Sequence, residues 1–542
     1  MTKVFFALLA ALACCGIAAS TEDIIQTTNG PVQGLTSGNM TAYLGIPYAS
    51  AGRWEIPEDP SPWVEPFQAN QYGDICPQTN SSAATLAATA ALEETGFDQP
   101  WNVVLGPPTT QSEDCLKINV YSPVGATKTP VMVYLHGGGL NTGNGNGFDY
   151  YSDPLLDKDV ILVTFNYRLG RLGYFAHPDL DATNFGLRDQ IKALEWVREN
   201  IANFGGDPDH VTIFGQSAGG GSVAMLLVSP LTENLFHRAI IESISTSGIQ
   251  NVTLEDAEPK GVAWGTSVGI AAGPDQLEKM KTIPFGDVIT NGTFQITSVY
   301  IDGQTMDIDT LTGFLEGKNR KVPVIIGSNA NEAGFYYLQG SQVPIYPLAY
   351  SPGPWQQFLP ANTSETYESF VRLIWGDDAD EVLSLYPSEE PLKSGQKMST
   401  DTMFTVPTLM IADAMASRGE DVHLYHFDQQ PPGSIGETYG AFHGSELPYI
   451  GFDTKELPVN PQNTILQDYM SSYWTNFAKT GDPNADGLPQ WETLPANTNE
   501  WFVLGPDVGT QDISKEMLEQ YALVKPQAIG LINQDKFQAE LS

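Results

Sequence analysis

The sequence predicts an α/β fold, in which a mostly parallel central sheet is flanked by helices and large insertions form a lid and a pocket. Two observations lead to this prediction. Strand-like and helix-like runs alternate through the first half of the chain. In addition, one serine lies between glycines where a strand-like run passes into a helix-like run. Hydrophobic residues make up 41% of the 542-residue chain, enough for a large core, and we predict one domain over residues 21–542.

The expected elements follow one another in a regular order. They are strands at residues 131–135 and 160–166, a helix at 187–203, a strand at 211–214, a buried helix ending at Pro230, and strands at 322–326 and 422–427. A long segment rich in aromatic and turn-forming residues separates the last two strands. We interpret it as insertions around a functional site and not as a second domain.

The stretch at residues 211–223 has the sequence VTIFGQSAGGGSV. Gly215, Ser217 and Gly219 fit the pattern Gly-x-Ser-x-Gly, which places a serine on a strand-to-helix turn so tight that only glycine fits two residues to either side. Ser267 lies in a second match to the pattern, but the residues before it do not have the character of a strand. Ser217 is therefore the candidate nucleophile.

A serine hydroxyl is a weak nucleophile until a base accepts its proton, so we expect a histidine beside it. Enzymes with such a serine turn take their catalytic residues in the chain order Ser, acid, His, so the histidine should follow Ser217. Four histidines do: His237 in a helix-like stretch, His423 and His426 in a strand-like stretch, and His443 in a glycine-flanked loop. The loop favours His443, and the spacing leaves the other three open.

The acid that holds the histidine should follow a strand between the serine and the histidine. Glu332 is so placed, because it comes just after the strand expected at residues 322–326. Asp302, Asp307 and Asp309 are rivals by position.

Glycines follow the strand expected at residues 131–135, in the run His-Gly-Gly-Gly that begins at His136. Attack on a carbonyl group creates an oxyanion, which preorganised backbone N–H groups stabilise. Side chains at these positions would block the approach of a substrate. We predict that the N–H groups of Gly138, Gly139 and Ala218 form the oxyanion hole.

The first twenty residues have the pattern of a secretory signal peptide. Lys3 precedes an apolar run at residues 4–13, and small residues occupy positions 18–20. The run is shorter than the roughly 20 apolar residues that a membrane-spanning helix needs. We therefore expect a secreted, extracellular protein that loses residues 1–20.

Cleavage would remove two of the four cysteines and leave Cys76 and Cys115. An even pair of cysteines in an oxidising compartment predicts a disulfide. Five Asn-x-Ser/Thr sequons are compatible with a secreted glycoprotein: Asn39, Asn80, Asn251, Asn291 and Asn362.

Acidic residues outnumber basic ones by 64 to 26, and no basic cluster interrupts this excess. Nucleic acids and anionic membranes are therefore not expected as partners. The carboxyl end, residues 535–542, is polar and has no lipid-anchor signal, so no stable membrane anchor is expected.

Several stretches resemble the type-B carboxylesterase and lipase family, which includes cholinesterases and large fungal lipases. They are EDCLKINV at residues 113–120, NFGLRDQ at 184–190, FGGDP at 204–208 leading into the serine motif, Glu332 in its glycine-led loop, HGSELP at 443–448 and WTNFAKTGDP at 474–483. The resemblance extends from about residue 24 to about residue 504. It implies an α/β-hydrolase fold, no cofactor, no metal, and Ser217, Glu332 and His443 as the catalytic triad.

The chain also departs from the family pattern. Ile244 stands where the family commonly has glycine, which leaves open any supporting role for Ser245. Gln216 replaces the glutamate that cholinesterases usually carry before the nucleophile, and this removes one attraction for a cationic substrate. The loop between the two cysteines is a lid in lipases of the family and carries a choline-contacting tryptophan in cholinesterases. Here we expect a short lid helix at residues 82–92, followed by Trp101.

These observations together predict a secreted, cofactor-free serine hydrolase that cleaves carboxylic esters through an acyl-enzyme intermediate. Its substrates would be small-molecule or lipid esters, and the protein would be a monomer or a weak homo-oligomer. The alternatives are a triacylglycerol lipase acting at interfaces, with less support a cholinesterase, and a non-catalytic adhesion or binding protein of the same fold.

Overall fold

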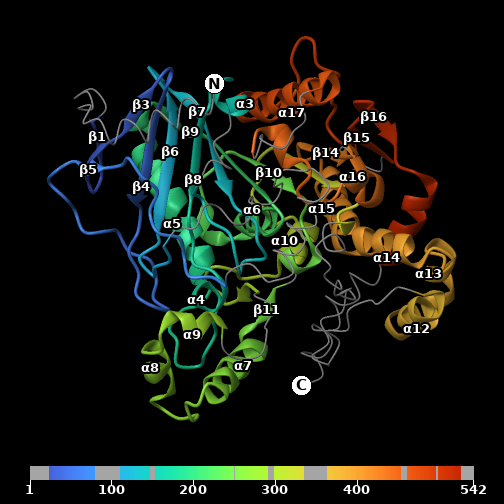
Figure 1. The fold of residues 1–542 in the computed structure, drawn as a ribbon, viewed down its shortest axis with the longest axis horizontal. Coiled ribbons are helices and arrows are strands. Elements are labelled where there is room, and N and C mark those ends of the chain that lie inside the picture. Colours follow the sequence, from blue (N-terminus) through green and yellow to red (C-terminus); the bar gives the residue numbers. More distant parts are fainter. Residues whose placement is uncertain are drawn as a thin grey trace.

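A computed structural model describes residues 24–79, 110–146, 153–249, 251–290, 298–334, 363–431, 433–452, 460–495 and 499–525 of the chain. Its main feature is a sheet of 11 strands in the order β16-β15-β14-β13-β10-β9-β7-β8-β6-β4-β3. Helices cover both faces of this sheet (Figure 1). The predicted α/β architecture is confirmed.

The strands of the main sheet are β3 (Leu35–Ser37), β4 (Met40–Pro47), β6 (Lys117–Pro123), β7 (Thr129–Leu135), β8 (Ile161–Phe165), β9 (Gly206–Gln216), β10 (Arg238–Glu242), β13 (Val324–Asn329), β14 (Val422–Phe427), β15 (Glu500–Leu504) and β16 (Gly509–Asp512). From β8 through β7, β9, β10, β13 and β14 to β15, every neighbouring pair is parallel. Antiparallel pairs occur only toward the two edges of this sheet, among β3, β4, β6 and β8 and between β15 and β16. The serine motif therefore lies at the end of a central strand.

The helices and short strands outside the main sheet have these bounds: α3 (Asp153–Leu156), α4 (Gly170–Gly173), α5 (Phe185–Asn200), α6 (Ala218–Val228), α7 (Leu254–Ser267), α8 (Gln276–Lys281), α9 (Phe285–Thr290), α10 (Thr310–Leu315), α12 (Ser364–Trp375), α13 (Ala379–Leu385), α14 (Pro391–Thr400), α15 (Val406–Ala416), α16 (Gly433–Tyr439), α17 (Pro461–Thr480), β1 (Ile24–Thr27), β2 (Gly30–Gln33), β5 (Phe67–Gln68), β11 (Val252–Thr253) and β12 (Tyr300–Ile301). A π-helical turn, Asp401–Thr405, joins α14 to α15. The segment from α12 to α15 lies between β13 and β14, where the sequence predicts insertions.

Consecutive residues of β7 are buried on opposite faces of the sheet. Val131 and Val133 belong to the core cluster that includes α5, α6, α10 and α15. Met132 and Tyr134 belong to the cluster that includes α17. Strands of a parallel sheet that is covered on both faces are apolar at every position, which explains why these strands are visible in the sequence as unbroken apolar runs.

One element prediction is wrong. His237 is not in a helix but directly precedes β10, and its Nδ1 accepts a hydrogen bond from the backbone N–H of Val211 at 3.3 Å. The neighbouring Leu235 and Phe236 pack in the core. Their apolar character comes from this packing at the start of a strand and not from a helical face.

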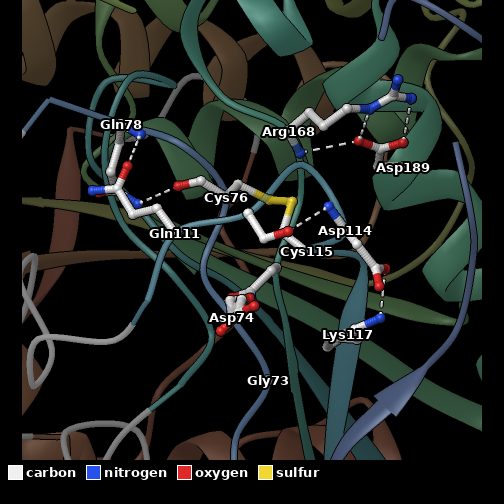
Figure 2. Close-up of a disulfide and its surroundings, with 12 residues drawn as sticks. Gly73, Asp74, Cys76, Gln78, Gln111, Asp114, Cys115, Lys117, Arg168 and Asp189 are labelled. Atoms are coloured by element: carbon white, nitrogen blue, oxygen red, sulfur yellow. Dashed lines mark hydrogen bonds and ion pairs between the residues drawn. A yellow bond between two sulfur atoms is a disulfide. The ribbon is translucent and has the colours of Figure 1, made fainter. Parts of the chain in front are cut away.

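The predicted disulfide between Cys76 and Cys115 is present (Figure 2). Next to it, the Gln78 side chain donates to the carbonyl of Gly143 at 2.8 Å and accepts from its N–H at 2.9 Å. The disulfide therefore fixes Gln78, which in turn fixes the loop that follows β7.

Several predictions fall outside the described residues. These are the signal peptide at residues 1–20, the lid helix at 82–92, Trp101, and the sequons at Asn80, Asn291 and Asn362.

Candidate active site

Ser217 lies on the turn between β9 and α6. Its backbone angles, φ 61° and ψ −125°, are outside the regions that residues other than glycine usually adopt. Such strain persists only where the surroundings enforce it, and it is common at active sites. The backbone N–H of Ser217 donates to the carbonyl of Glu242 on β10 at 2.9 Å, which ties the turn to the neighbouring strand.

The flanking glycines are required by close approach. A Cβ atom on Gly219 would lie 2.0 Å from the carbonyl oxygen of Leu135. A Cβ atom on Gly215 would lie 2.7 Å from both Leu135 O and Gly219 C. The end of β7 and the start of α6 thus meet at a distance that no side chain permits, as the Gly-x-Ser-x-Gly pattern predicts.

The structure pairs His443 with Glu332. His443 lies in the loop after α16, Glu332 follows β13, and His443 Nδ1 is 2.6 Å from Glu332 Oε2. The other carboxylate oxygen accepts the backbone N–H of Asn329 at 2.8 Å. Glu332 is fully buried. Both of its carboxylate oxygens therefore accept hydrogen bonds from the protein in a place that water does not reach. This pairing can hold the imidazole with its proton on Nδ1 and its lone pair on Nε2.

The rival acids do not approach this histidine. Asp302 accepts three backbone N–H groups of the turn that follows it, from Gln304 to Met306. Asp309 caps α10 by accepting from Thr312 N at 3.0 Å, and Asp307 is exposed. These carboxylates have structural or surface positions.

The rival histidines lie within β14. His423 is buried among aromatic side chains, and burial lowers its pKa. His426 stacks on Trp501 with ring centroids 3.9 Å apart, and burial lowers its pKa to about 4. A neutral imidazole packed in a sheet is not positioned to exchange protons with a substrate.

Gln216 connects the serine turn to His443. It is the last residue of β9, and its Nε2 lies 3.3 Å from His443 Nε2. The contact brings the imidazole to the residue that directly precedes Ser217. The sequence provides no signal for this contact, because the two residues are 227 positions apart.

The glycine loop after β7 runs against the same turn. A Cβ atom on Gly137 would lie 3.2 Å from the Cβ of Ser217. Gly138 and Gly139 have positive φ angles of 108° and 63°, and no atom lies within 4 Å of the position that a Cβ of Gly139 would occupy. Ala218 is the first residue of α6, so its N–H is among those that the helix leaves without an internal partner. The oxyanion hole predicted at Gly138, Gly139 and Ala218 thus involves a loop and a helix start that both adjoin Ser217.

His136, at the start of this loop, is buried and stacks on Tyr167 with ring centroids 4.2 Å apart. Its carbonyl oxygen accepts the Tyr167 hydroxyl at 2.7 Å. Burial lowers the pKa of His136 to about 4, so the side chain is neutral and serves to fix the loop.

Two further buried carboxyl groups lie behind the triad candidates. Glu446 accepts from the Asn329 amide and faces the Ser243 hydroxyl at 3.5 Å, and Glu242 accepts from Trp474 Nε1 at 2.9 Å. Burial, reinforced by the charge of Glu332, raises the pKa of Glu446 to about 7. Burial and the charge of Glu446 raise the pKa of Glu242 well above its usual range.

Sequence analysis did not find this carboxyl cluster. Glu446 belongs to the HGSELP motif, and Glu242 ends an apolar strand. An acidic residue at the end of an apolar strand is the sequence feature that could have indicated a buried carboxyl group. Ser243 faces this cluster through its hydroxyl, which lies 3.5 Å from Glu446 Oε1. Ile244, which stands at the position of the family glycine, is fully buried in the core.

Phe404 packs beside His443. Its ring centroid lies 4.9 Å from that of His443, and it belongs to the π-helical turn between α14 and α15. Single π-turns inside helices are frequent at functional sites. The insertion between β13 and β14 therefore contributes directly to the surroundings of the histidine.

A cavity of about 290 Å³ lies elsewhere, lined mainly by residues 49–53 and 113–116. It contains none of the candidate catalytic residues.

The chain is similar to known proteins over most of its length. Residues 21–521 match the family described as the carboxylesterase family. Para-nitrobenzyl esterase of Bacillus subtilis (strain 168) is 32% identical, with 90% of this chain and 96% of that protein aligned. Liver carboxylesterase 1 of Oryctolagus cuniculus is 31% identical, with 89% and 91% aligned. A solved structure of a PNB esterase has a TM-score of 0.76 at 30% identity and covers 92% of this chain and 99% of its own.

Proposed function

The chain belongs to the carboxylesterase family, whose members are carboxylic ester hydrolases and have the α/β-hydrolase fold, and on this premise we propose that it cleaves esters through an acyl-enzyme formed on Ser217. The observation that carries the proposal is the pairing of His443 with Glu332 at 2.6 Å, next to a strained serine turn. A buried histidine that is oriented by a carboxylate is the arrangement that activates a serine hydroxyl.

The proposed reaction has two halves, and the first forms the acyl-enzyme. Ser217 Oγ attacks the ester carbonyl carbon while His443 Nε2 accepts the hydroxyl proton. The carbonyl oxygen becomes an oxyanion, which the N–H groups of Gly138, Gly139 and Ala218 stabilise. When the tetrahedral intermediate collapses, the C–O bond to the alcohol breaks and His443 returns the proton to the leaving oxygen.

The second half of the reaction repeats the first with water. His443 accepts a proton from water, the resulting hydroxide attacks the acyl carbon, and Ser217 Oγ leaves and regains the proton. Glu332 accepts a hydrogen bond from Nδ1–H throughout, without taking its proton, and stabilises the imidazolium that forms in each half. No step of this scheme uses a cofactor or a metal.

We further propose that the protein is secreted and loses residues 1–20. The disulfide between Cys76 and Cys115 and the exposed sequon at Asn39 are compatible with an oxidising compartment. Asn251 is a poorer glycan acceptor, because its side-chain oxygen accepts both the N–H and the hydroxyl of Thr310. Within the described residues, no helix is both long enough and apolar enough to cross a membrane.

The test is hydrolysis of p-nitrophenyl esters from acetate to palmitate by the wild-type protein and by Ser217→Ala. We expect the variant to lose at least about a thousandfold in kcat/KM. A fluorophosphonate should label the wild type at Ser217 and leave the variant unlabelled. A non-catalytic binding protein would not be labelled, and activity that survives in Ser217→Ala would exclude the proposed mechanism.

This series, together with a triglyceride and choline esters as further substrates, separates the enzyme classes. A maximum at short chains indicates a carboxylesterase with a small acyl pocket. A sharp rise above the solubility limit of a triglyceride indicates an interfacial lipase, and a preference for choline esters over uncharged esters of similar size indicates a cholinesterase.

A further inference from the structure

The side chain of Gln78 links the disulfide to the glycine loop that follows β7. Gln78 is only 6% exposed, and its Nε2 donates to the carbonyl of Cys76 at 3.1 Å (Figure 2). The same nitrogen donates to the carbonyl of Gly143 at 2.8 Å, and Oε1 accepts the N–H of Gly143 at 2.9 Å. The Gln78 backbone N–H donates to the Gln111 side chain at 3.0 Å. One buried amide therefore holds both backbone polar groups of Gly143.

Gly143 is also the residue at which the loop closes on its own beginning. A Cβ atom on Gly143 would lie 2.4 Å from His136 Nδ1 and 2.6 Å from the carbonyl oxygen of Gly137. Its φ angle of 108° is in the range that favours glycine. His136 is fixed in turn by stacking on Tyr167. The two ends of the loop, residues 136–137 and residue 143, are thus packed against each other.

The peptide group between Gly138 and Gly139 has its orientation fixed inside this loop. The carbonyl oxygen of Gly138 accepts the N–H of Asn141 at 3.1 Å, and the N–H and hydroxyl of Thr142 at 3.0 and 3.1 Å. In a trans peptide group the C=O and the following N–H point in opposite directions. The N–H of Gly139 is therefore directed away from the turn at residues 141–142. Among the described residues it donates to no backbone carbonyl, so it is available to an oxyanion.

This orientation depends on the bonds to Gly138 and not on local sterics. Glycine adopts positive and negative φ angles with similar ease, so a peptide group between two glycines can rotate at little steric cost. A rotated peptide would present a carbonyl oxygen where the N–H belongs, and that oxygen would repel an oxyanion. The groups that prevent the rotation belong to Asn141 and Thr142, and Thr142 directly precedes the residue that Gln78 holds.

We propose that Gln78 is a positioning residue for the oxyanion hole: by holding Gly143 it fixes the turn at residues 141–142, and this turn keeps the Gly139 N–H directed at the reacting carbonyl oxygen. The inference rests on the proposed function, in which that oxygen becomes an oxyanion. Because the oxyanion forms during the reaction and is absent from the bound ester, the contribution of Gln78 belongs to the transition state.

The experiment compares Gln78→Met with the wild type. Methionine has a similar length but cannot donate to either carbonyl. Fluorophosphonate labelling run to completion counts the active sites, so kcat can be expressed per labelled site. This kcat should fall by about 10- to 100-fold, while KM stays within about twofold. A trifluoromethyl ketone, which forms an oxyanion when a serine hydroxyl adds to it, should bind more weakly by a similar factor. A purely structural role would lower the number of labelled sites and leave kcat per site unchanged.

Gln276→Met is the matched control. Gln276 is a buried glutamine whose Nε2 also donates to two backbone carbonyls, those of Val262 and Ile270, each at 3.0 Å. It begins α8, which packs in a cluster that contains none of the candidate catalytic residues. This variant tests whether the loss of any buried amide lowers kcat per site, and we expect no loss.

Gln78→Glu is a second variant, which decides the question if Gln78→Met does not fold. It keeps the shape of the side chain and an acceptor for the Gly143 N–H, but its carboxylate has no N–H donor for the two carbonyls. It should also lose kcat per site. Wild-type values of kcat per site and of ketone affinity in the Gln78 variants, or an equal loss in Gln276→Met, would overturn the inference.

A further measurement separates this inference from the proposed function. If the wild type neither hydrolyses esters nor reacts with a fluorophosphonate, the proposed function fails. Amide hydrogen exchange in a peptide that contains residues 137–143 then decides the inference without any catalysis. Faster exchange in Gln78→Met than in the wild type and in Gln276→Met supports the role of Gln78 in holding the loop, and coincident exchange overturns it.

Discussion

Replacement of the buried carboxyl group Glu446 by its neutral isostere should change how the stability of the protein depends on pH. The pKa of Glu446 is raised from 4.5 to about 7, mainly by burial and further by the charge of Glu332. The protonated form is therefore favoured in the folded state. The stability that this group contributes is fully present below about pH 4.5 and is lost as the pH rises through about 7.

The size of the effect follows from this shift. A rise of about 2.5 units corresponds to about 3 kcal/mol, at about 1.4 kcal/mol per unit. Glutamine does not titrate, and its amide can still accept from Asn329 with Oε1 and donate to the Ser243 hydroxyl. Between pH 4.5 and pH 8, Glu446→Gln should thus gain about 3 kcal/mol of stability relative to the wild type.

Thermal unfolding at these two pH values provides the assay. A protein of this size loses about 1 kcal/mol of stability per degree near its midpoint. The difference in Tm between Glu446→Gln and the wild type should accordingly move by about 3 °C in favour of the variant at the higher pH. Glu278→Gln is the control, because Glu278 has a side chain that is 72% exposed and should show no such movement. An equal Tm difference at both pH values would refute the reasoning, since it would mean that Glu446 does not retain its proton when the protein folds.

Two further predictions concern stability. Gly219→Ala should destabilise the fold by about 3 kcal/mol or more and abolish ester hydrolysis, because the added Cβ would lie 2.0 Å from Leu135 O. The control is Gly286→Ala in α9, which should leave Tm unchanged or slightly raised because no atom lies within 4 Å of the new Cβ. Equal effects of the two substitutions in a thermal melt would contradict this argument. Cys76→Ser opens a loop of 39 residues and should cost about 4 kcal/mol in urea unfolding, whereas an unchanged urea midpoint would show that the unfolded chain is not constrained by this loop.

The sequence predicts the central strands because each is buried on both faces, but it predicts their ends less well. β9 begins at Gly206 and not at Val211, since Thr129 of β7 pairs with Gly206 and extends the ladder through polar residues. β13 likewise continues to Asn329, where small and polar residues pair with β14. Backbone pairing determines where these strands end, and the pattern of apolar residues does not indicate this pairing.

The serine turn was predictable for a different reason. A steric requirement acts on the backbone itself, so it leaves glycines at fixed spacing around Ser217. The pairing of Glu332 with His443 has no such local mark, and position alone left three aspartates and three other histidines open. The contact of Gln216 with His443 depends on how β9 and the loop after α16 come together in space, so no short stretch of sequence contains it.

The carboxyl cluster shows how three buried acids can serve one imidazole. Glu332 accepts a backbone N–H and the imidazole N–H, so both of its oxygens are bonded as a carboxylate requires. Glu446 accepts from one amide and faces one hydroxyl, and Glu242 accepts only from Trp474, its Oε2 having no partner among the described residues. Glu242 therefore has the fewest donors of the three carboxyl groups.

Burial disfavours an ionised carboxyl group, and it raises the pKa values of both Glu446 and Glu242. These two groups should therefore keep their protons at a pH where an exposed glutamate has lost its own. Three ionised groups would stabilise the imidazolium too strongly for it to return its proton to the leaving alcohol. With fewer ionised groups beside it, His443 could both accept and return a proton, which is what the proposed acyl transfer requires of it.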